Sequence, residues 1–174
     1  MAKLAFSKLS LKVNNEVKTI EFNGNSIEVK QYLPVNDKLT LIGNVINSAA
    51  DDNNFANPIK ISVFTTLELL YNYTNLSFTD KQKEDPTKLY DMVISNGLVK
   101  EVVNAIPEEE YEELISGIAE SVKSIYTYQN SVYGILDAVA TDYSNLDLDA
   151  TNIQKKLADP ENMDLLKQVL TKLG

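Results

Sequence analysis

Residues 17–30 read VKTIEFNGNSIEVK. Two segments rich in β-branched and aromatic residues flank Asn23-Gly24, and this dipeptide favours a two-residue hairpin because both residues tolerate positive φ. Each segment alternates apolar with charged or polar side chains, so we expect one face of the hairpin to be buried and the other solvated. Two or three strands are marginally stable alone, so helices must pack on the apolar face.

The residues before this hairpin continue the strand pattern. Leu9, Leu11 and Val13 alternate with polar residues, which is the two-residue period of a half-buried strand. The sequence therefore predicts an antiparallel meander of two or three strands over residues 7–33, and Pro34 ends it.

Helical spacing begins after Pro34. Asn36 or Asp37 is expected to cap a first helix, since short polar side chains accept the free N–H groups of a first turn. The apolar residues that repeat at helical spacing in this segment are Leu39, Ile42, Val45, Ile46 and Ala49.

A second helix is predicted to begin at Asn57-Pro58, where Asn can cap and Pro is favoured at the first helical position. Its residues are apolar on almost every side as far as Tyr73, so we expect it to be the central buried helix. A strand over residues 59–64 is the alternative, because this start is rich in β-branched residues.

Two shorter helices are predicted next. A charged loop leads to Asp85-Pro86, a cap followed by Pro, and the helix that starts there is expected to stop at Gly97. A helix over residues 98–106 follows. Pro107 then begins a segment with five glutamates in residues 108–113, which we expect to be solvated partners of the helix dipole.

A 3.5-residue repeat runs through the segment after Pro107 for more than four heptads. A continuous helix over residues 107–143 would be about 55 Å long at ~1.5 Å per residue, whereas a compact chain of this length has a radius of gyration of roughly 16 Å. Such a helix would overhang its own globule or be covered by another chain; a break near Gln129, giving two consecutive core helices, is the alternative. The candidate interface consists of Tyr111, Ile115, Ile118, Val122, Ile125, Gln129, Val132, Leu136, Val139 and Tyr143.

We expect one domain of the α+β class, mostly α, in which an N-terminal antiparallel β-meander precedes a helical bundle with one long heptad-patterned helix. Its parts are the meander over residues 1–33, core helices over 34–106, the long helix or helix pair over 107–143, and C-terminal helices over 144–174.

Composition restricts the chemistry. The 174 residues include no His, Cys, Arg or Trp, which excludes His- or Cys-based nucleophilic catalysis and zinc or iron–sulfur sites built on those ligands. No acid–base pair, calcium loop or phosphate-binding glycine pattern is selected by the remaining residues, so we expect no enzyme activity and no cofactor. The nine tyrosines suit either core packing with a solvated hydroxyl or a protein interface.

The net charge of -9 is uneven. Residues 1–100 carry eleven Lys and eleven acidic residues, whereas residues 101–174 carry five Lys and fourteen acidic residues. The C-terminal part therefore repels nucleic acid, and it either aids solubility or steers a basic partner. No apolar run approaches the ~18 residues of a membrane span, so neither nucleic acid nor a membrane is an expected partner.

Four stretches after the meander resemble, in this order, small proteins encoded among the structural genes of tailed bacteriophages of Gram-positive hosts. They are QYLP at 31–34, YNYTNLSFT at 71–79, KLYD at 88–91 and IPEEEY at 106–111. The chain resembles the group regarded as tail assembly chaperones or minor virion proteins over most of its length.

The resemblance implies a non-enzymatic protein that binds other phage structural proteins or itself, with a homo-oligomer as one outcome. It implies a location in the host bacterial cytoplasm or in the virion, and it assigns no functional residue because that group has no catalytic set. The alternative function is that of an acidic phage-encoded inhibitor, which would occupy a basic cleft of a host defence enzyme.

Overall fold

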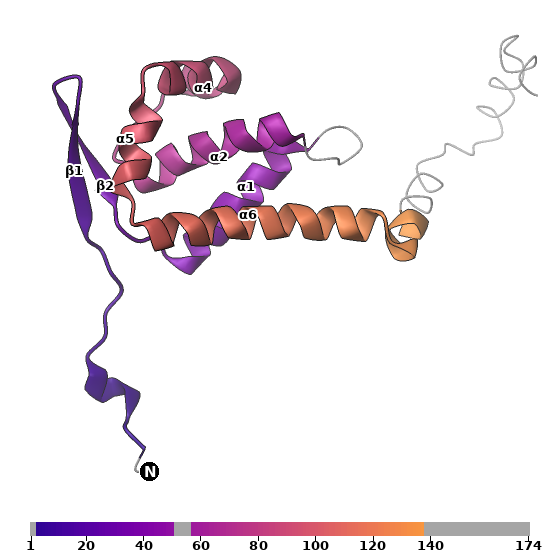
Figure 1. Cartoon of the computed structure of the whole chain (residues 1–174), viewed down its shortest axis with the longest axis horizontal. Helices are drawn as coiled ribbons and strands as arrows, with labels where there is room; N and C mark the ends of the chain where they lie inside the picture. The colour runs from indigo at the N-terminus through magenta and orange to yellow at the C-terminus, as the bar shows by residue number, and fades with distance from the viewer. Residues whose placement is uncertain (1–2, 51–56, 138–174) are drawn as a thin grey trace, which may run out of the picture. The chain divides into compact units, whose positions relative to one another are not determined.

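A computed structural model describes residues 3–50 and 57–137 of the chain (Figure 1). The chain divides into two compact units, Met1–Tyr126 and Thr127–Gly174. The fold is α+β and mostly α, as the sequence predicts. Its elements are the 3₁₀ helix η1 (Phe6–Leu9), strands β1 (Val17–Phe22) and β2 (Asn25–Lys30), and helices α1 (Val35–Ala49), α2 (Pro58–Tyr73), α3 (Asp80–Lys83), α4 (Pro86–Ser95), α5 (Leu98–Ala105) and α6 (Glu108–Gln129).

The predicted hairpin is confirmed. β1 and β2 pair antiparallel around a two-residue turn, in which Asn23 and Gly24 have φ of 50° and 74°. Ile27 and Val29 are buried on one face of the sheet, while the alternate residues of β2 are exposed. The sheet is therefore covered on one side only, as the alternation predicts.

The third strand is not found. Residues 6–9 form η1, and residues 10–16 belong to neither a helix nor a strand. Leu9, Leu11 and Val13 are all exposed. A two-residue period indicates only that a segment is able to pair as a strand. In the described residues, no strand pairs with residues 9–13.

Helix α1 begins earlier than predicted, and its buried face is rotated. Its N-cap is Pro34, whose carbonyl accepts the N–H groups of Asp37 and Lys38, so the expected capping by Asn36 or Asp37 is wrong. Leu39 is exposed rather than part of the core. The buried residues are Lys38, Leu41, Val45 and Ala49.

Helix α2 is the central helix that the sequence predicts, and the alternative of a strand over 59–64 is wrong. The Asn57 side chain accepts the N–H groups of Ile59 and Lys60 at its start. Leu70 and Tyr73 are completely buried toward its end. In Figure 1, α2 lies between α4 and α6.

The predicted caps of the next helices are also observed. Asp85 accepts the N–H of Lys88 at the start of α4, and Gly97 has a φ of 79° between α4 and α5. The loop before α4 contains the short helix α3, in which Thr79 and Gln82 form a reciprocal capping box. The sequence predicts a charged loop here, so the short helix α3 is a difference from the prediction.

Helix α6 ends at Gln129, so a continuous helix over residues 107–143 is wrong and the break is found. Tyr128 accepts the N–H of Ser131 in the turn, and residues 132–137 are helical again. A Cβ added to Gly134 would clash with the carbonyl oxygen of Tyr128, so this turn needs glycine there. The helices predicted within 144–174 lie outside the described residues.

Candidate functional site

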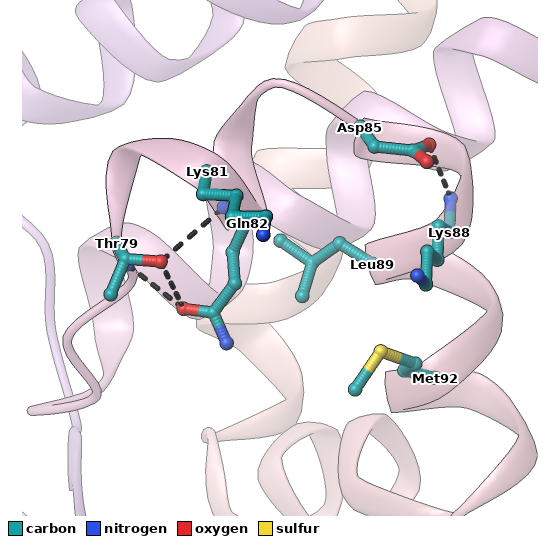
Figure 2. A pocket seen from close by; sticks show the side chains of 7 residues that line it. All are labelled: Thr79, Lys81, Gln82, Asp85, Lys88, Leu89 and Met92. Atoms are coloured by element: carbon teal, nitrogen blue, oxygen red, sulfur yellow. Dashed lines mark hydrogen bonds between the residues drawn. The ribbon is translucent and has the colours of Figure 1, made fainter.

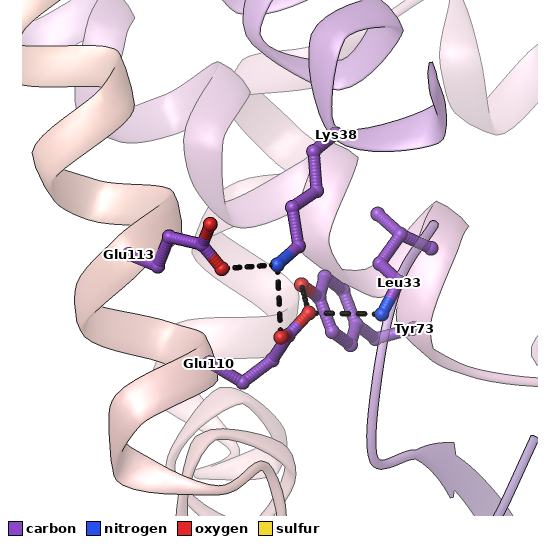
Figure 3. Close-up of polar contacts among 5 residues, drawn as sticks. All are labelled: Leu33, Lys38, Tyr73, Glu110 and Glu113. Carbon is purple, nitrogen blue, oxygen red and sulfur yellow. Dashed lines mark hydrogen bonds and ion pairs between the residues drawn. The ribbon is translucent and has the colours of Figure 1, made fainter. Parts of the chain in front are cut away.

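The most connected polar group in the described residues surrounds Glu110 (Figure 3). We call the side chains of Lys38, Tyr73, Glu110 and Glu113, with the backbone N–H of Leu33, the Glu110 cluster. Glu110 Oε1 accepts the Leu33 N–H and the Tyr73 hydroxyl, each at 2.8 Å, and its Oε2 lies 2.9 Å from Lys38 Nζ. The Glu110 residue is only 7% exposed. The cluster therefore joins α1, α2, α6 and the β2–α1 connection.

Helical spacing explains why Glu110 is inside. It starts a row of residues four apart, continued by Leu114 and Ile118, which are the three buried residues of α6. The expectation that all glutamates of residues 108–113 are solvated is therefore wrong for Glu110. The i, i+4 row that ends in buried apolar residues is the signal that could have identified it.

Lys38 lies on the buried side of α1, as Glu110 does on α6. Its ammonium bonds to both Glu110 and Glu113, and it lies 4.9 Å from the centroid of the Tyr32 ring. Burial lowers the pKa of Lys38, but the hydrogen bonds to Glu113 and Glu110 outweigh burial, so the pKa is raised. Lys38 therefore remains charged.

Tyr73 completes the cluster from α2. Its side chain is fully buried, and burial, followed by the hydrogen bond to Glu110, raises the pKa of its hydroxyl. Its hydroxyl donates to Glu110 and is not solvated. The expectation of core packing with a solvated hydroxyl is therefore wrong for Tyr73. Both carboxylate oxygens of Glu110 accept hydrogen bonds from the chain itself. The cluster therefore stabilises the packing of α1, α2 and α6 against one another.

Alkaline pH is expected to reduce the stability that the Glu110 cluster contributes to the fold. The folded chain keeps the protons of Tyr73 and Lys38 at pH values where the unfolded chain releases them, near 10.0 and 10.5. A raised folded-state pKa stabilises fully below the unfolded value and less as the pH rises above it. We expect the free energy of unfolding to fall as the pH rises from the unfolded-state pKa of each group toward its folded-state pKa, with a slope of at most about 1.4 kcal/mol per pH unit for each group.

Urea unfolding between neutral pH and strong alkali measures this dependence. The stability of Tyr73→Phe should fall more gradually with pH, because this variant loses the contribution of the Tyr73 hydroxyl and retains those of Lys38 and Tyr71, whose pKa values are also raised. The exposed Tyr128 offers a matched control, since Tyr128→Phe should follow the wild-type curve. A Tyr73→Phe curve parallel to the wild type would contradict the buried neutral hydroxyl.

A second site is a cavity of about 320 Å³ beside α3 and α4 (Figure 2). Thr79 and Gln82 bond to each other, and Asp85 accepts the Lys88 N–H at 3.0 Å, so these polar groups already cap helices. The remaining lining residues are Lys81, Lys88, Leu89 and Met92. The cavity therefore combines two lysine side chains with apolar atoms.

The described residues contain no group of three or more acidic side chains placed to hold a metal ion. At the Glu110 cluster, the position between the two carboxylates is taken by the Lys38 ammonium. Within the described part of the chain, no helix is long and apolar enough to cross a lipid bilayer.

The structure distributes the heptad residues over different environments. Ile118 is buried in the core of its own unit, and Tyr111 and Val122 pack against that core. Ile115, Ile125 and Gln129 are half-buried, whereas Val132 and Leu136 are 71% and 59% exposed. Val139 and Tyr143 lie outside the described residues. An intermolecular seam over the exposed positions stays a prediction.

Sequence reasoning missed an exposed N-terminal arm, which we define as residues 3–13. Every residue of the arm is exposed. Its large apolar side chains are at least 47% exposed, with Phe6 at 75% and Leu11 at 67%. The alternation in this segment predicts a strand, but only the structure reveals that no strand among residues 3–50 and 57–137 pairs with the segment. The exposed apolar residues of the arm are Leu4, Phe6, Leu9, Leu11 and Val13.

Comparison of the chain with protein-family models, with curated proteins and with solved structures finds no match.

Proposed function

We propose that this is a non-enzymatic protein that acts through protein–protein contacts, in the virion or tail assembly of a bacteriophage. The observation that carries the proposal is the exposed arm, where five large apolar side chains lie within eleven residues. Contiguous exposed apolar groups mark interaction sites, since each side chain gains about 1.5–3 kcal/mol when it is fully buried.

The polar chemistry of the described residues supports a binding protein over an enzyme. The most buried carboxylate, Glu110, accepts three donors, and the Tyr73 hydroxyl that could act as its acid partner is held neutral and buried. General acid–base catalysis requires a group that is free to exchange a proton with a substrate. A turnover that needs Mg²⁺ or Mn²⁺ and disappears in Glu110→Gln would contradict this part of the proposal.

The second candidate, an inhibitor of a host defence enzyme, is favoured by one observation. Glu108, Glu109, Glu112 and Glu113 are exposed in the first turns of α6, and their charge suits a basic cleft. The same charge opposes phosphate, so binding to DNA or RNA at physiological salt is not expected.

Co-purification with each protein encoded beside this one tests the proposal. We expect a neighbouring structural protein to bind the full chain and to lose binding when Leu4 and Phe6 are both replaced by Asp. The matched control replaces Val35 and Leu39, two exposed apolar residues of α1, by Asp and should retain binding. Equal binding by both double variants would remove the arm as the contact surface.

A further inference from the structure

We propose that residues 9–13 of the arm pair as a strand with the open edge of β1 in a second copy of this chain. The two-stranded sheet of each copy then gains a third strand. This inference rests on the proposed function, in which the arm is a contact surface, and it assigns residues 9–13 of the arm to contact between two copies of the chain.

The open edge follows from the strand register. Ile20 pairs with Ile27 and Phe22 with Asn25 across the turn, and Gln31 donates its N–H to the Glu16 carbonyl at 2.9 Å. Hydrogen-bonded pairs alternate with non-hydrogen-bonded pairs in an antiparallel ladder. The backbone groups that point away from β2 therefore belong to the intervening residues of β1, which are Val17, Thr19 and Glu21.

The two edges of the sheet differ in their hydrogen-bond partners. On β2, the outward groups of Glu28 bond to Asn75, which accepts through its side chain and donates through its N–H, both at 3.2 Å. On β1, the described residues provide no such partner for Val17, Thr19 or Glu21. An unpaired edge is a template for another strand.

The arm has the properties of the missing strand. Leu9, Leu11 and Val13 alternate with Ser10 and Lys12, and a two-residue period presents all three apolar side chains on one face of a strand.

In the described part of the single chain, few backbone hydrogen bonds stabilise the conformation of the arm. The backbone bond from Lys8 to Ala5 is local, and the chain after η1 continues through Ser10 at a φ of 50°. A positive φ is unfavourable for serine, so pairing in extended form would also relieve this residue.

Charge complementarity favours a second copy as the partner. The arm has three Lys and no acidic residue, whereas the other described residues have nine Lys and seventeen acidic residues. A basic arm is attracted to the acidic body of another copy. Exchange is also reciprocal, since each copy donates one strand and accepts one, which closes a two-fold dimer.

Engineered cysteines test the pairing directly, because the chain has none of its own. Chains with Leu11→Cys are mixed under oxidation with chains carrying a single cysteine at one position of β1: Val17→Cys, Lys18→Cys, Thr19→Cys, Ile20→Cys or Glu21→Cys. We expect a mixed disulfide dimer with at least one edge position, in yield at least about tenfold above Glu28→Cys on the covered edge. Consecutive positions are used because the proposal fixes neither the register nor the sheet face on which Leu11 lies, and a disulfide needs Cα atoms within about 7 Å.

A double variant that combines Leu11→Cys with the β1 cysteine giving the highest yield of mixed dimer separates pairing between copies from pairing within one chain. At high dilution, an intramolecular disulfide would mean that the arm folds back on its own β1, and it would overturn the proposal. Absence of any mixed dimer above the Glu28→Cys control would overturn it as well.

Light scattering of the full chain gives an independent readout. We expect twice the mass of one chain for the wild type and a monomer for Leu9→Asp/Leu11→Asp, whose changed side chains are exposed in the single chain. Thr19→Pro should also be monomeric, because it removes an outward N–H without touching the β1–β2 ladder, and Thr19→Val should remain a dimer. Circular dichroism measures whether each variant is folded. If Thr19→Pro is unfolded, the mass of Leu9→Asp/Leu11→Asp decides the test.

The two proposals fail differently. A wild type that is monomeric up to sub-millimolar concentration overturns the strand exchange. If such a monomer still binds a neighbouring structural protein through Leu4 and Phe6, the proposed function stands without it.

Discussion

Replacing Glu110 by alanine is expected to lower the free energy of unfolding by about 3–5 kcal/mol. The substitution leaves the Leu33 N–H and the Tyr73 hydroxyl without their acceptor, and a buried donor that loses its partner carries its full desolvation cost. It also leaves the ammonium of Lys38 with Glu113 alone, whose side chain is 68% exposed. Urea unfolding followed by circular dichroism measures the change.

Matched variants separate the charge from the shape of this side chain. Glu112→Ala removes an exposed glutamate in the same helix and should change stability by less than about 0.5 kcal/mol. Lys38→Met combined with Glu110→Leu should be less destabilising than the sum of the two single changes, because no unpaired charge remains buried. A Glu110→Ala variant as stable as Glu112→Ala would mean that the Glu110 cluster is open in solution.

Local signals predicted most of the elements. Asn23-Gly24, Asn57-Pro58 and Asp85-Pro86 each act through the backbone conformation of adjacent residues, so the sequence alone indicates where the hairpin turns and where two helices begin. Gly97 follows the same logic at the end of α4. None of these predictions depends on which other segment packs nearby.

For the Glu110 cluster, the sequence indicates at most that Glu110 is buried, through its row with Leu114 and Ile118, and it does not identify the partners of Glu110. Lysine and glutamate are normally counted as exposed, and each is buried here only because the other lies opposite on a helix far away in sequence. Reading Lys38 as polar shifted the expected apolar face of α1 toward Leu39, which is exposed. The long-range partner is the information that the sequence pattern lacks.

The heptad was misleading for a related reason. Its spacing of four and three selects Tyr111, Ile115 and Ile118, whereas the buried row of α6 keeps a spacing of four from Glu110 through Leu114 to Ile118. The two rows share Ile118. A periodic pattern identifies an apolar face within a few tens of degrees, and the neighbouring α1 and α2 decide which edge of that face is buried.

Ile118→Asp is therefore expected to unfold the chain, whereas the same kind of substitution at another heptad position, Leu136→Asp, is expected to leave it folded. Ile118 is 4% exposed within the core, and an unpaired carboxylate there costs several kcal/mol. Together with the lost packing, this consumes most or all of the roughly 5–15 kcal/mol that stabilises a typical domain.

Leu136 is exposed in the single chain, so an aspartate at this position remains in water and the melting temperature should change by less than about 2 °C. Circular dichroism melting of both variants, with light scattering on each, measures fold and association together. If Leu136→Asp melts like the wild type but loses self-association or partner binding, the heptad beyond Gln129 is an interface. If Ile118→Asp melts cooperatively at the wild-type temperature, the placement of α6 against α1 and α2 is wrong, because a buried helix face cannot accept an unpaired charge without loss of stability.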